Sequence, residues 1–386
     1  MLFLAALLLG GCVGATGARP GAAGAAPAEV RVAFDARGVT SLRASGVADR
    51  ATGRPVSADD PVRVASISKL VVALGVMRMV EAGQLNLDRD VSRWLGWRVR
   101  NPSFPDAPVT LRMLLSHRSG LIDPPEYRVP LGERLADVIA RDALWDAAHP
   151  PGAYFRYANV GFPVIASVME KASGERFDRL MQRLVLAPLK LDACFNWSTC
   201  SDERITRAVV LYRAGGEVAL DDLNGRRPDC AVIATAGCDL AAYRLGENGA
   251  LFSPQGGLRA SMRDLAVIGG MLLRNDGSFL KPESIAELER VAWTFDGANG
   301  DTTAGFYCRY GLAVTTLPSR QAGCADDLFG DGRVRVGHAG EAYGLRSGLW
   351  IDRAAGTGVA FFATATPPDS KGASAFSREE ERLARE

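Results

Sequence analysis

The sequence predicts an α+β protein in which strands from both chain ends form one antiparallel sheet, with a mostly helical domain inserted between them. Apolar residues alternate near the N-terminus and again near the C-terminus, a pattern typical of strands. Between these regions, apolar residues recur at helical spacing. The composition, 47% hydrophobic and 23% charged over 386 residues, is that of a globular chain able to bury a large core.

The N-terminal strand pattern begins after a segment that resembles a targeting signal. Residues 1–12, MLFLAALLLGGC, form an apolar run with small residues before Cys12. This predicts a bacterial lipoprotein signal, cleaved so that Cys12 carries the lipid. A positively charged start is missing, so an ordinary secretory signal is the alternative. Residues 13–28 are rich in Gly, Ala and Pro and predict a flexible tether.

Two strands are expected in 29–49, joined by a turn at Ala36-Arg37-Gly38. A helix is expected over 67–82, because apolar residues recur at helical spacing until Gly83. Most of 85–250 is expected to be helical, most clearly at 161–174 and 177–189, whereas 194–250 looks irregular. Further along the chain, a helix is expected at 261–275 and strands are expected within 333–340, 346–353 and 358–366. Residues 29–375 are expected to form one domain, which a C-terminal helix over 376–386 follows.

Seven cysteines are present, and an even six remain once Cys12 is set aside for lipid. An even number in an exported chain indicates disulfides. Pairing between sequence neighbours is the prediction, although six cysteines allow 15 pairings and reduced thiols are the alternative. The predicted pairs are Cys194 with Cys200, Cys230 with Cys238, and Cys308 with Cys324.

Ser66 and Lys69 form the first candidate catalytic pair. Only five of the 45 basic residues are lysine, and a buried lysine, unlike arginine, can lose its proton. At the start of a helix the two side chains share one face, and the helix N-terminus supplies free N–H groups. The alternative is an N-cap serine beside a surface lysine. Ser278 and Lys281 have the same spacing, but the neighbouring Asp-Gly and Pro predict a turn.

Tyr157 and Asn159, within PGAYFRYANVGF, form the second candidate motif. A lysine cation about 4 Å from Tyr157 would stabilise its phenolate by roughly 4 kcal/mol at an effective dielectric near 20, before the opposing cost of burial. Tyr157 could then take the proton of Ser66 and pass it to the leaving group. A core tyrosine beside a turn asparagine is the alternative interpretation.

The third motif is His338-Ala339-Gly340, at the end of a predicted strand. A small residue followed by glycine lets a substrate lie close to the strand backbone. His338 considered alone is more often structural than catalytic. Of the other histidines, His117 is interpreted as a loop residue that supports the cleft, and His149 as a surface residue.

Together, Ser-x-x-Lys, Tyr-x-Asn and His-x-Gly in this order resemble the serine β-lactamase and penicillin-binding family, in its branch of class C β-lactamases, DD-peptidases and related esterases. The flanking segments VRVASISKL, LRMLLSHRSGL and QGGLRASMRDLA carry the same resemblance. It covers about residues 30 to 365. It implies a β-lactamase/transpeptidase-like fold.

The resemblance also implies roles for individual residues. Ser66 would form an acyl-enzyme, Lys69 would share its proton and Tyr157 would act as general base and acid, although the base in such sites is disputed. The remaining implied site residues are Asn159, His338 and Gly340, with the backbone N–H groups of Ser66 and Glu341 as the oxyanion hole. No metal or organic cofactor is required.

Two positions depart from the family pattern. Many relatives have lysine in place of His338, and most have threonine or serine in place of Ala339. The missing hydroxyl usually helps to hold a substrate carboxylate, so its absence disfavours efficient β-lactamase or DD-carboxypeptidase activity. Arg346 could supply that contact, and a solvated strand arginine is the alternative.

The leading hypothesis is an exported, periplasmic serine hydrolase that cleaves an ester, amide or peptide bond of a small molecule or peptide. The alternative is a penicillin-recognising binding protein with little turnover. A net charge of +1 gives no indication of nucleic-acid binding, and after the N-terminus no apolar run of membrane-spanning length occurs, so membrane contact is expected only through the lipid anchor. No Gly-x-Ser-x-Gly is present, and three histidines are few for a metallohydrolase.

Overall fold

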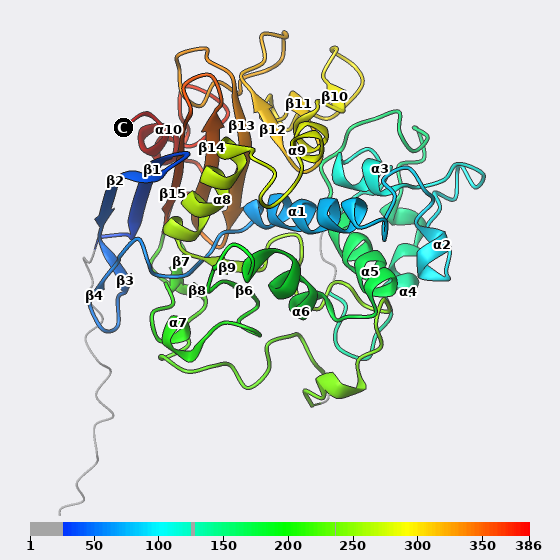
Figure 1. Ribbon diagram of the computed structural model, residues 1–386, viewed down its shortest axis with the longest axis horizontal. Coiled ribbons are helices and arrows are strands. Elements are labelled where there is room, and N and C mark those ends of the chain that lie inside the picture. Colours follow the sequence, from blue (N-terminus) through cyan, green and yellow to red (C-terminus); the bar gives the residue numbers. More distant parts are fainter. Residues whose placement is uncertain (1–25, 125–127, 236) are drawn as a thin grey trace, which may run out of the picture.

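The structure, a computed structural model, describes residues 26–124, 128–235 and 237–386, and its central element is an eight-stranded antiparallel sheet (Figure 1). The strand order is β10-β11-β12-β13-β14-β15-β1-β2, so strands from the two chain ends are neighbours, as predicted. The strands are β1 (Glu29–Asp35), β2 (Gly38–Ser45), β10 (Trp293–Thr294), β11 (Arg309–Tyr310), β12 (Thr315–Leu317), β13 (Arg335–Ala342), β14 (Leu345–Asp352) and β15 (Thr357–Ala363).

The predicted signal segment with Cys12 and most of the predicted tether lie outside the described residues. Ala28, which was predicted to belong to the tether, is buried, and its N–H donates to Thr364 Oγ1 at 2.9 Å. No helix within the described ranges combines the length and the hydropathy needed for a membrane span.

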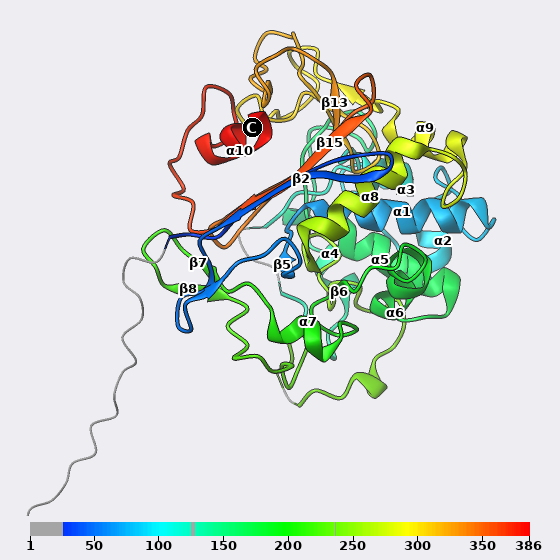
Figure 2. The same ribbon diagram turned by 60° about the vertical axis from the view of Figure 1, so that its left-hand side comes forward.

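Helices cover both faces of the sheet (Figure 2). Helices α1 (Ile67–Glu81) and α8 (Met262–Arg274) lie on one face, and α10 (Arg378–Arg385) lies on the other. A Cβ at Gly269 would lie only 2.2 Å from the Phe34 ring, so glycine allows α8 to pack closely against β1. The resulting layers bury an aliphatic core between the sheet and α1, which fixes the start of α1 beside the sheet.

The segment 85–250 was expected to be mostly helical, and this expectation is wrong. Only α5 (Gly161–Ser173) is a long helix, and the predicted helix at 177–189 is divided into one α-helical turn and one π-helical turn. Frequent prolines and glycines break the remaining apolar pattern. The other helical elements are α2 (Ser92–Leu95), α3 (Leu111–Leu115), α4 (Leu135–Ile139), η1 (Asp142–Leu144), α6 (Phe177–Met181), η2 (Gln182–Leu186), α7 (Asp202–Thr206), η3 (Leu240–Ala242) and α9 (Pro282–Glu289).

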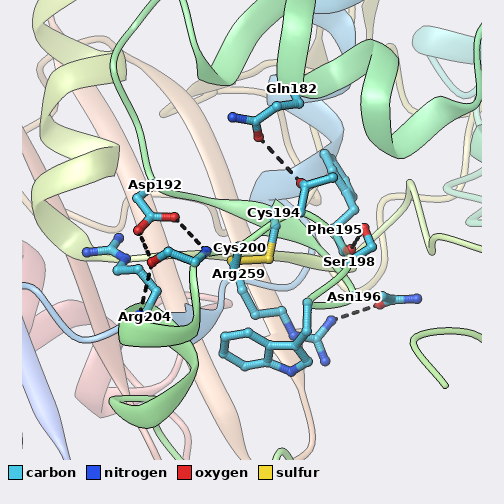
Figure 3. The surroundings of a disulfide bond; sticks show 12 residues. Gln182, Asp192, Cys194, Phe195, Asn196, Ser198, Cys200, Arg204 and Arg259 are labelled. Carbon is cyan, nitrogen blue, oxygen red and sulfur yellow. Dashed lines mark hydrogen bonds between the residues drawn. A yellow bond between two sulfur atoms is a disulfide. The ribbon is translucent and has the colours of Figure 1, made fainter. Parts of the chain in front are cut away.

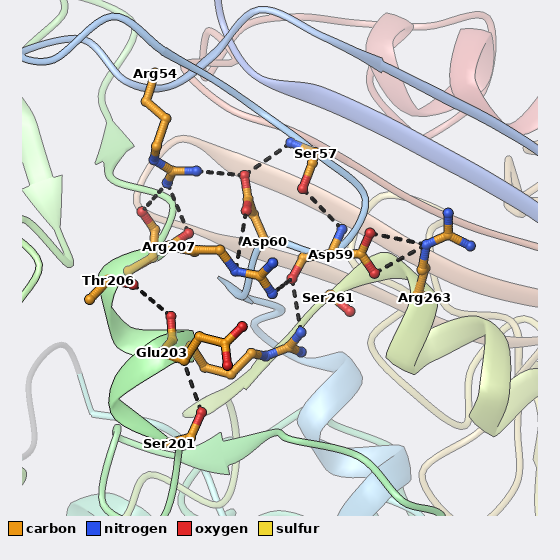
Figure 4. A network of polar contacts seen from close by, with 12 residues as sticks. Arg54, Ser57, Asp59, Asp60, Ser201, Glu203, Thr206, Arg207, Ser261 and Arg263 are labelled. Atoms are coloured by element: carbon orange, nitrogen blue, oxygen red, sulfur yellow. Dashed lines mark hydrogen bonds and ion pairs between the residues drawn. The ribbon is translucent and has the colours of Figure 1, made fainter.

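A three-stranded sheet, in the order β5-β9-β6, holds the chain just ahead of α1. Polar contacts anchor the segment before β5 to α7 and α8 (Figure 4). The carboxylate of buried Asp60 accepts hydrogen bonds from Arg54 and Ser57, and Asp59 pairs with Arg263. The small strands are β3 (Val47–Asp49), β4 (Arg54–Pro55), β5 (Val62–Arg63), β6 (Cys194–Phe195), β7 (Leu211–Tyr212), β8 (Val218–Leu220) and β9 (Leu258–Ala260).

Three disulfide bonds among the described residues cross-link irregular segments, and each joins two cysteines that are neighbours in the order of the sequence, as predicted. They join Cys194 to Cys200, Cys230 to Cys238, and Cys308 to Cys324. The first closes the turn after β6, beside Arg259 of β9 (Figure 3).

Candidate active site

Ser66 stands at the N-terminus of α1, immediately after a sharp turn at Ala65, whose φ is +49°. The serine side chain makes no capping hydrogen bond, and Lys69 is fully buried. Ser66 therefore occupies the N-cap position without capping the helix, and the alternative of a surface lysine beside it is wrong. The turn and the helix start leave the hydroxyl of Ser66 available to Lys69.

Lys69 Nζ contacts three oxygen atoms. It lies 2.9 Å from Ser66 Oγ, 2.8 Å from Asn159 Oδ1 and 2.7 Å from the carbonyl oxygen of Gln255. The side-chain oxygen of Asn159 and the carbonyl oxygen of Gln255 can only accept hydrogen bonds. A neutral amine has two N–H groups, and these can donate one hydrogen bond to each of the two oxygens. The lone pair of neutral Lys69 would therefore face the hydroxyl of Ser66.

The protonation state of Lys69 is balanced near neutrality. Its pKa is lowered to about 7, chiefly by burial; the carboxylate of Asp123 opposes this shift, and the nearby charge of Arg63 adds a smaller lowering. A base is most useful when its pKa lies close to the working pH. The amine of Lys69 is thus suited to accept the proton of Ser66.

Asp123 fixes the orientation of Asn159. Its Oδ2 accepts hydrogen bonds from both the backbone N–H and the side-chain Nδ2 of Asn159, each at 2.8 Å. Its Oδ1 accepts from the N–H of Val160, also at 2.8 Å. Because the amide nitrogen of Asn159 is held by Asp123, its oxygen is turned toward Lys69.

Tyr157 lies on the other side of Lys69, whose Nζ is 4.9 Å from the centroid of its ring. The ring stacks on Tyr307 at 4.6 Å and lies 4.2 Å from the ring of His117. Its hydroxyl is buried without a hydrogen bond of normal geometry. The N–H of Ala158 donates to His117 Nδ1 at 3.2 Å, so His117 supports this loop.

The expectation that Lys69 lowers the pKa of Tyr157 is contradicted. Burial raises the pKa of Tyr157 above its usual value, and the neighbouring hydroxyls of Ser66 and Tyr307 offset only part of that effect. A lysine with a pKa of about 7 is only partly charged at neutral pH, which weakens the attraction assumed from the sequence. Tyr157 is therefore a neutral phenol at neutral pH.

His338 is fully buried behind Tyr157. Its Nδ1 lies 2.5 Å from the carbonyl oxygen of Ala339 and must carry the proton, so Nε2 accepts from the hydroxyl of Tyr310 at 2.8 Å. Burial and the charge of Lys69 lower the pKa of His338 to about 3. This geometry makes His338 a neutral support for the aromatic wall and does not expose its ring to a substrate.

Strand β13 brings Gly340 against the chain that precedes Ser66. A Cβ on Gly340 would lie 2.4 Å from the carbonyl oxygen of Val64, so only glycine permits this approach. The predicted oxyanion donor Glu341 is the next residue, but its side chain pairs with Arg346 on β14. The proposed carboxylate contact of Arg346 thus competes with a partner inside the protein.

Sequence reasoning missed Asp123, Gln255, Tyr307 and Tyr310. The cluster of aromatic residues in GFYCRYG, residues 305–311, was the available signal for the two tyrosines. No comparable signal marked the carboxylate of Asp123 or the carbonyl group of Gln255, because their roles depend on contacts between distant segments. His149, read as a surface residue, is partly exposed and bonds to Asp146 at 3.0 Å. The described residues contain no group of His, Cys, Asp and Glu side chains suited to a metal ion.

Comparisons with known proteins agree with this arrangement. The family model Beta-lactamase matches residues 11–384. Esterase EstB of Burkholderia gladioli is 30% identical over 276 residues, which cover 64% of this chain and 65% of the esterase. Matches to two penicillin-binding proteins span only 32% and 39% of their lengths, so the chain covers less than two thirds of each of these relatives.

Solved structures share the fold over nearly the whole chain. EstCE1, a hydrolase with promiscuous acyltransferase activity, superposes with a TM-score of 0.69 and 22% identity, covering 94% of each chain. The D-amino acid amidase of Ochrobactrum anthropi SV3 gives a TM-score of 0.67 and 20% identity, covering 93% of this chain and 92% of the amidase. The β-lactamase/transpeptidase-like fold predicted from the sequence is confirmed, and the chain belongs to the beta-lactamase family of serine hydrolases.

Proposed function

We propose that this protein is a serine hydrolase that cleaves small carboxylic esters through an acyl-enzyme on Ser66. The observation that carries the proposal is the environment of Lys69 Nζ, which lies 2.9 Å from Ser66 Oγ while two oxygens that can only accept occupy its other N–H bonds. This arrangement suits a neutral amine that accepts the serine proton.

Acylation would begin with transfer of the Ser66 proton to Lys69 as Oγ attacks the ester carbonyl. The backbone N–H groups of Ser66 and Glu341 would stabilise the resulting oxyanion. Tyr157, a neutral phenol beside both groups, would donate its proton to the leaving alcohol and regain one from Lys69. Water would then release the acid by the same steps in reverse.

The choice of an ester rests on the relatives and on one departure in β13. EstB is an esterase by name, and EstCE1 is described as a hydrolase with acyltransferase activity. Ala339 lacks the hydroxyl that most relatives use to hold a substrate carboxylate. We therefore expect ester turnover to exceed cleavage of β-lactams and of D-Ala-D-Ala peptides.

The test compares a short-chain nitrophenyl ester, nitrocefin and a D-Ala-D-Ala peptide with wild type and Ser66→Ala. Ser278→Ala is a matched control, because exposed Ser278 has the same spacing to a lysine but lies in a turn before α9. We expect Ser66→Ala to abolish ester turnover and Ser278→Ala to retain it. Equal ester rates in wild type and Ser66→Ala would contradict the proposal.

A binding role would give a different result in the same experiment. A penicillin-recognising protein with little turnover would form a stable adduct with a penicillin, detectable by mass spectrometry, and would release no product from any of the three substrates. We expect multiple turnovers of the ester, and adduct formation without turnover would favour the binding role.

We further propose that the protein is exported and lipidated at Cys12. The three disulfides support export, since such bonds persist in oxidising compartments. Metabolic labelling with a radioactive fatty acid tests the anchor directly. Wild type should carry the label and Cys12→Ser should not, and an unlabelled wild type would contradict lipidation.

A further inference from the structure

Arg63 lies beside the candidate active site and has no ion-pair partner among the residues that the structure describes. It lies on β5, three residues before Ser66, and is only partly exposed. Its Nε is buried without a hydrogen-bond partner, and its guanidinium forms no ion pair within 4.0 Å among the described residues. A guanidinium held in this way lacks the compensation that buried charges usually have.

Asp221, a carboxylate whose charge acts on Arg63, is hydrogen-bonded to other groups. Asp221 accepts from Arg259 Nη2 at 2.7 Å and from the indole N–H of Trp197 at 2.9 Å. Arg259 is directly opposite Arg63 in the pairing of β5 with β9. Arg63 and Arg259 thus share one neighbouring carboxylate, whose hydrogen bonds come from Arg259 and Trp197 and not from Arg63.

The free guanidinium lies close to the segment that binds Lys69. A Cβ on Gly256 would lie 3.7 Å from Arg63 Nη2 and 3.7 Å from the carbonyl carbon of Ala65. Gly256 follows Gln255, whose carbonyl oxygen contacts Lys69. Gly256 therefore lies between the guanidinium of Arg63 and the chain that leads into Ser66, which places that guanidinium close to the nucleophile.

An aromatic ring holds the guanidinium in place. The Arg63 guanidinium carbon lies 5.1 Å from the centroid of the Tyr343 ring, in the turn between β13 and β14. Stacking of this kind fixes the plane of a guanidinium while leaving its edge free for a bidentate contact with a carboxylate. Arg346, the arginine considered for this role from sequence, already pairs with Glu341.

We propose that Arg63 is a specificity-determining residue that binds a carboxylate carried by the substrate, so that the enzyme prefers esters with a free acid group. The proposal rests on the proposed ester hydrolysis and adds the class of ester. One unpaired cation matches a monoanion such as a carboxylate. The other charged groups nearby, Arg259 and Asp221, already satisfy each other.

The experiment uses two pairs of esters that are matched in shape and differ in charge. Nitrophenyl hemiglutarate against nitrophenyl pentanoate places the carboxylate on the acyl side. 4-Butyryloxybenzoate against phenyl butyrate places it on the leaving group. The values of kcat/KM are measured for wild type, Arg63→Gln, Arg63→Lys and Arg346→Gln. Arg93→Gln is a control that removes an exposed arginine of α2.

Measurements at pH 9 separate recognition from general base chemistry. Because the charge of Arg63 lowers the pKa of Lys69, its removal also slows neutral esters near pH 7. At pH 9 Lys69 is deprotonated in either protein, so the anionic-to-neutral ratio reports recognition alone. We expect Arg63→Gln to lower that ratio by about tenfold or more for at least one pair, Arg63→Lys to lower it less, and Arg93→Gln to preserve it.

Each other outcome has a defined meaning. If wild type and Arg63→Gln hydrolyse the esters with the same anionic-to-neutral ratio of kcat/KM in both pairs, the role of Arg63 is overturned and ester hydrolysis still stands. If Arg346→Gln lowers the anionic-to-neutral ratio of kcat/KM and Arg63→Gln does not, the residue that binds the substrate carboxylate is Arg346 and not Arg63. No turnover of any ester by wild type would overturn both proposals. If Arg63→Gln does not fold, judged by circular dichroism, the comparison is decided by Arg63→Lys.

Discussion

The two sides of the candidate site satisfy their polar groups in opposite ways. On one side, Lys69 Nζ has three oxygen partners within 2.9 Å. On the other side, the hydroxyl of Tyr157 is enclosed by aromatic rings and has no hydrogen bond of normal geometry. Burial shifts both groups toward their neutral forms: it lowers the pKa of Lys69 to about 7 and raises the pKa of Tyr157.

This difference indicates which residue acts as the base and which as the acid. A group with a pKa near neutrality can both take and return a proton, whereas a phenol with a raised pKa stays protonated at neutral pH and accepts a proton only as it passes its own to Lys69. The two sides therefore supply a base and an acid at the same time. The following predictions test each side, beginning with the largest expected effect.

Replacing Lys69 with arginine should be the most damaging change on the lysine side. A guanidinium keeps its proton, so it cannot accept the proton of Ser66. We expect ester kcat/KM to fall by roughly a thousandfold or more. The charge is retained in this variant, so activity close to wild type would show that Lys69 acts only as a cation.

Replacing Tyr157 with phenylalanine tests the aromatic side. We expect kcat/KM to fall by about a hundredfold, because the leaving group loses its proton donor. The thermal midpoint should stay unchanged or rise, since the lost hydroxyl is buried and has no hydrogen bond of normal geometry to any described residue. Tyr307→Phe serves as the control, and an equal loss in both variants would contradict a specific role for Tyr157.

Replacing Asp123 with asparagine tests the electrostatic effect of Asp123 on Lys69. Asp123 holds Asn159, and its charge raises the pKa of Lys69. We expect kcat/KM to fall by about tenfold and the pH midpoint of the activity profile to move to lower pH. A midpoint that stays in place or moves upward would contradict this electrostatic link.

Replacing Lys69 with methionine should change the dependence of stability on pH. Between pH 7 and about 10.5 the unfolded chain keeps a proton on Lys69 that the folded protein has released, so wild-type stability gains from rising pH across this window. The variant lacks this gain, which we expect to be on the order of a few kcal/mol at most. Urea unfolding of both proteins at pH 7 and pH 9.5 measures the difference, and parallel curves would contradict the lowered pKa.

The scaffold was more predictable than the electrostatics. Alternating apolar residues marked β1, β2 and β13–β15, and the spacing of Ser66 and Lys69 followed from the start of a helix. The pKa of Tyr157 was predicted in the wrong direction, because burial outweighs the other effects on it, and the aromatic rings that enclose it come from segments distant in sequence. The contacts of Lys69 with Gln255, and of Asp123 with Asn159, join loops that no local pattern pairs.

The central claim is that Lys69 is neutral for much of the time near neutral pH. Labelling lysine with carbon-13 at the ε position and following its NMR signals across a pH titration measures this directly, because the chain has only five lysines. The signal absent from Lys69→Met should titrate near pH 7, well below the ordinary value of a lysine, about 10.4. That signal is the one whose midpoint decides the question. Titration of that signal near pH 10.4 would contradict the account.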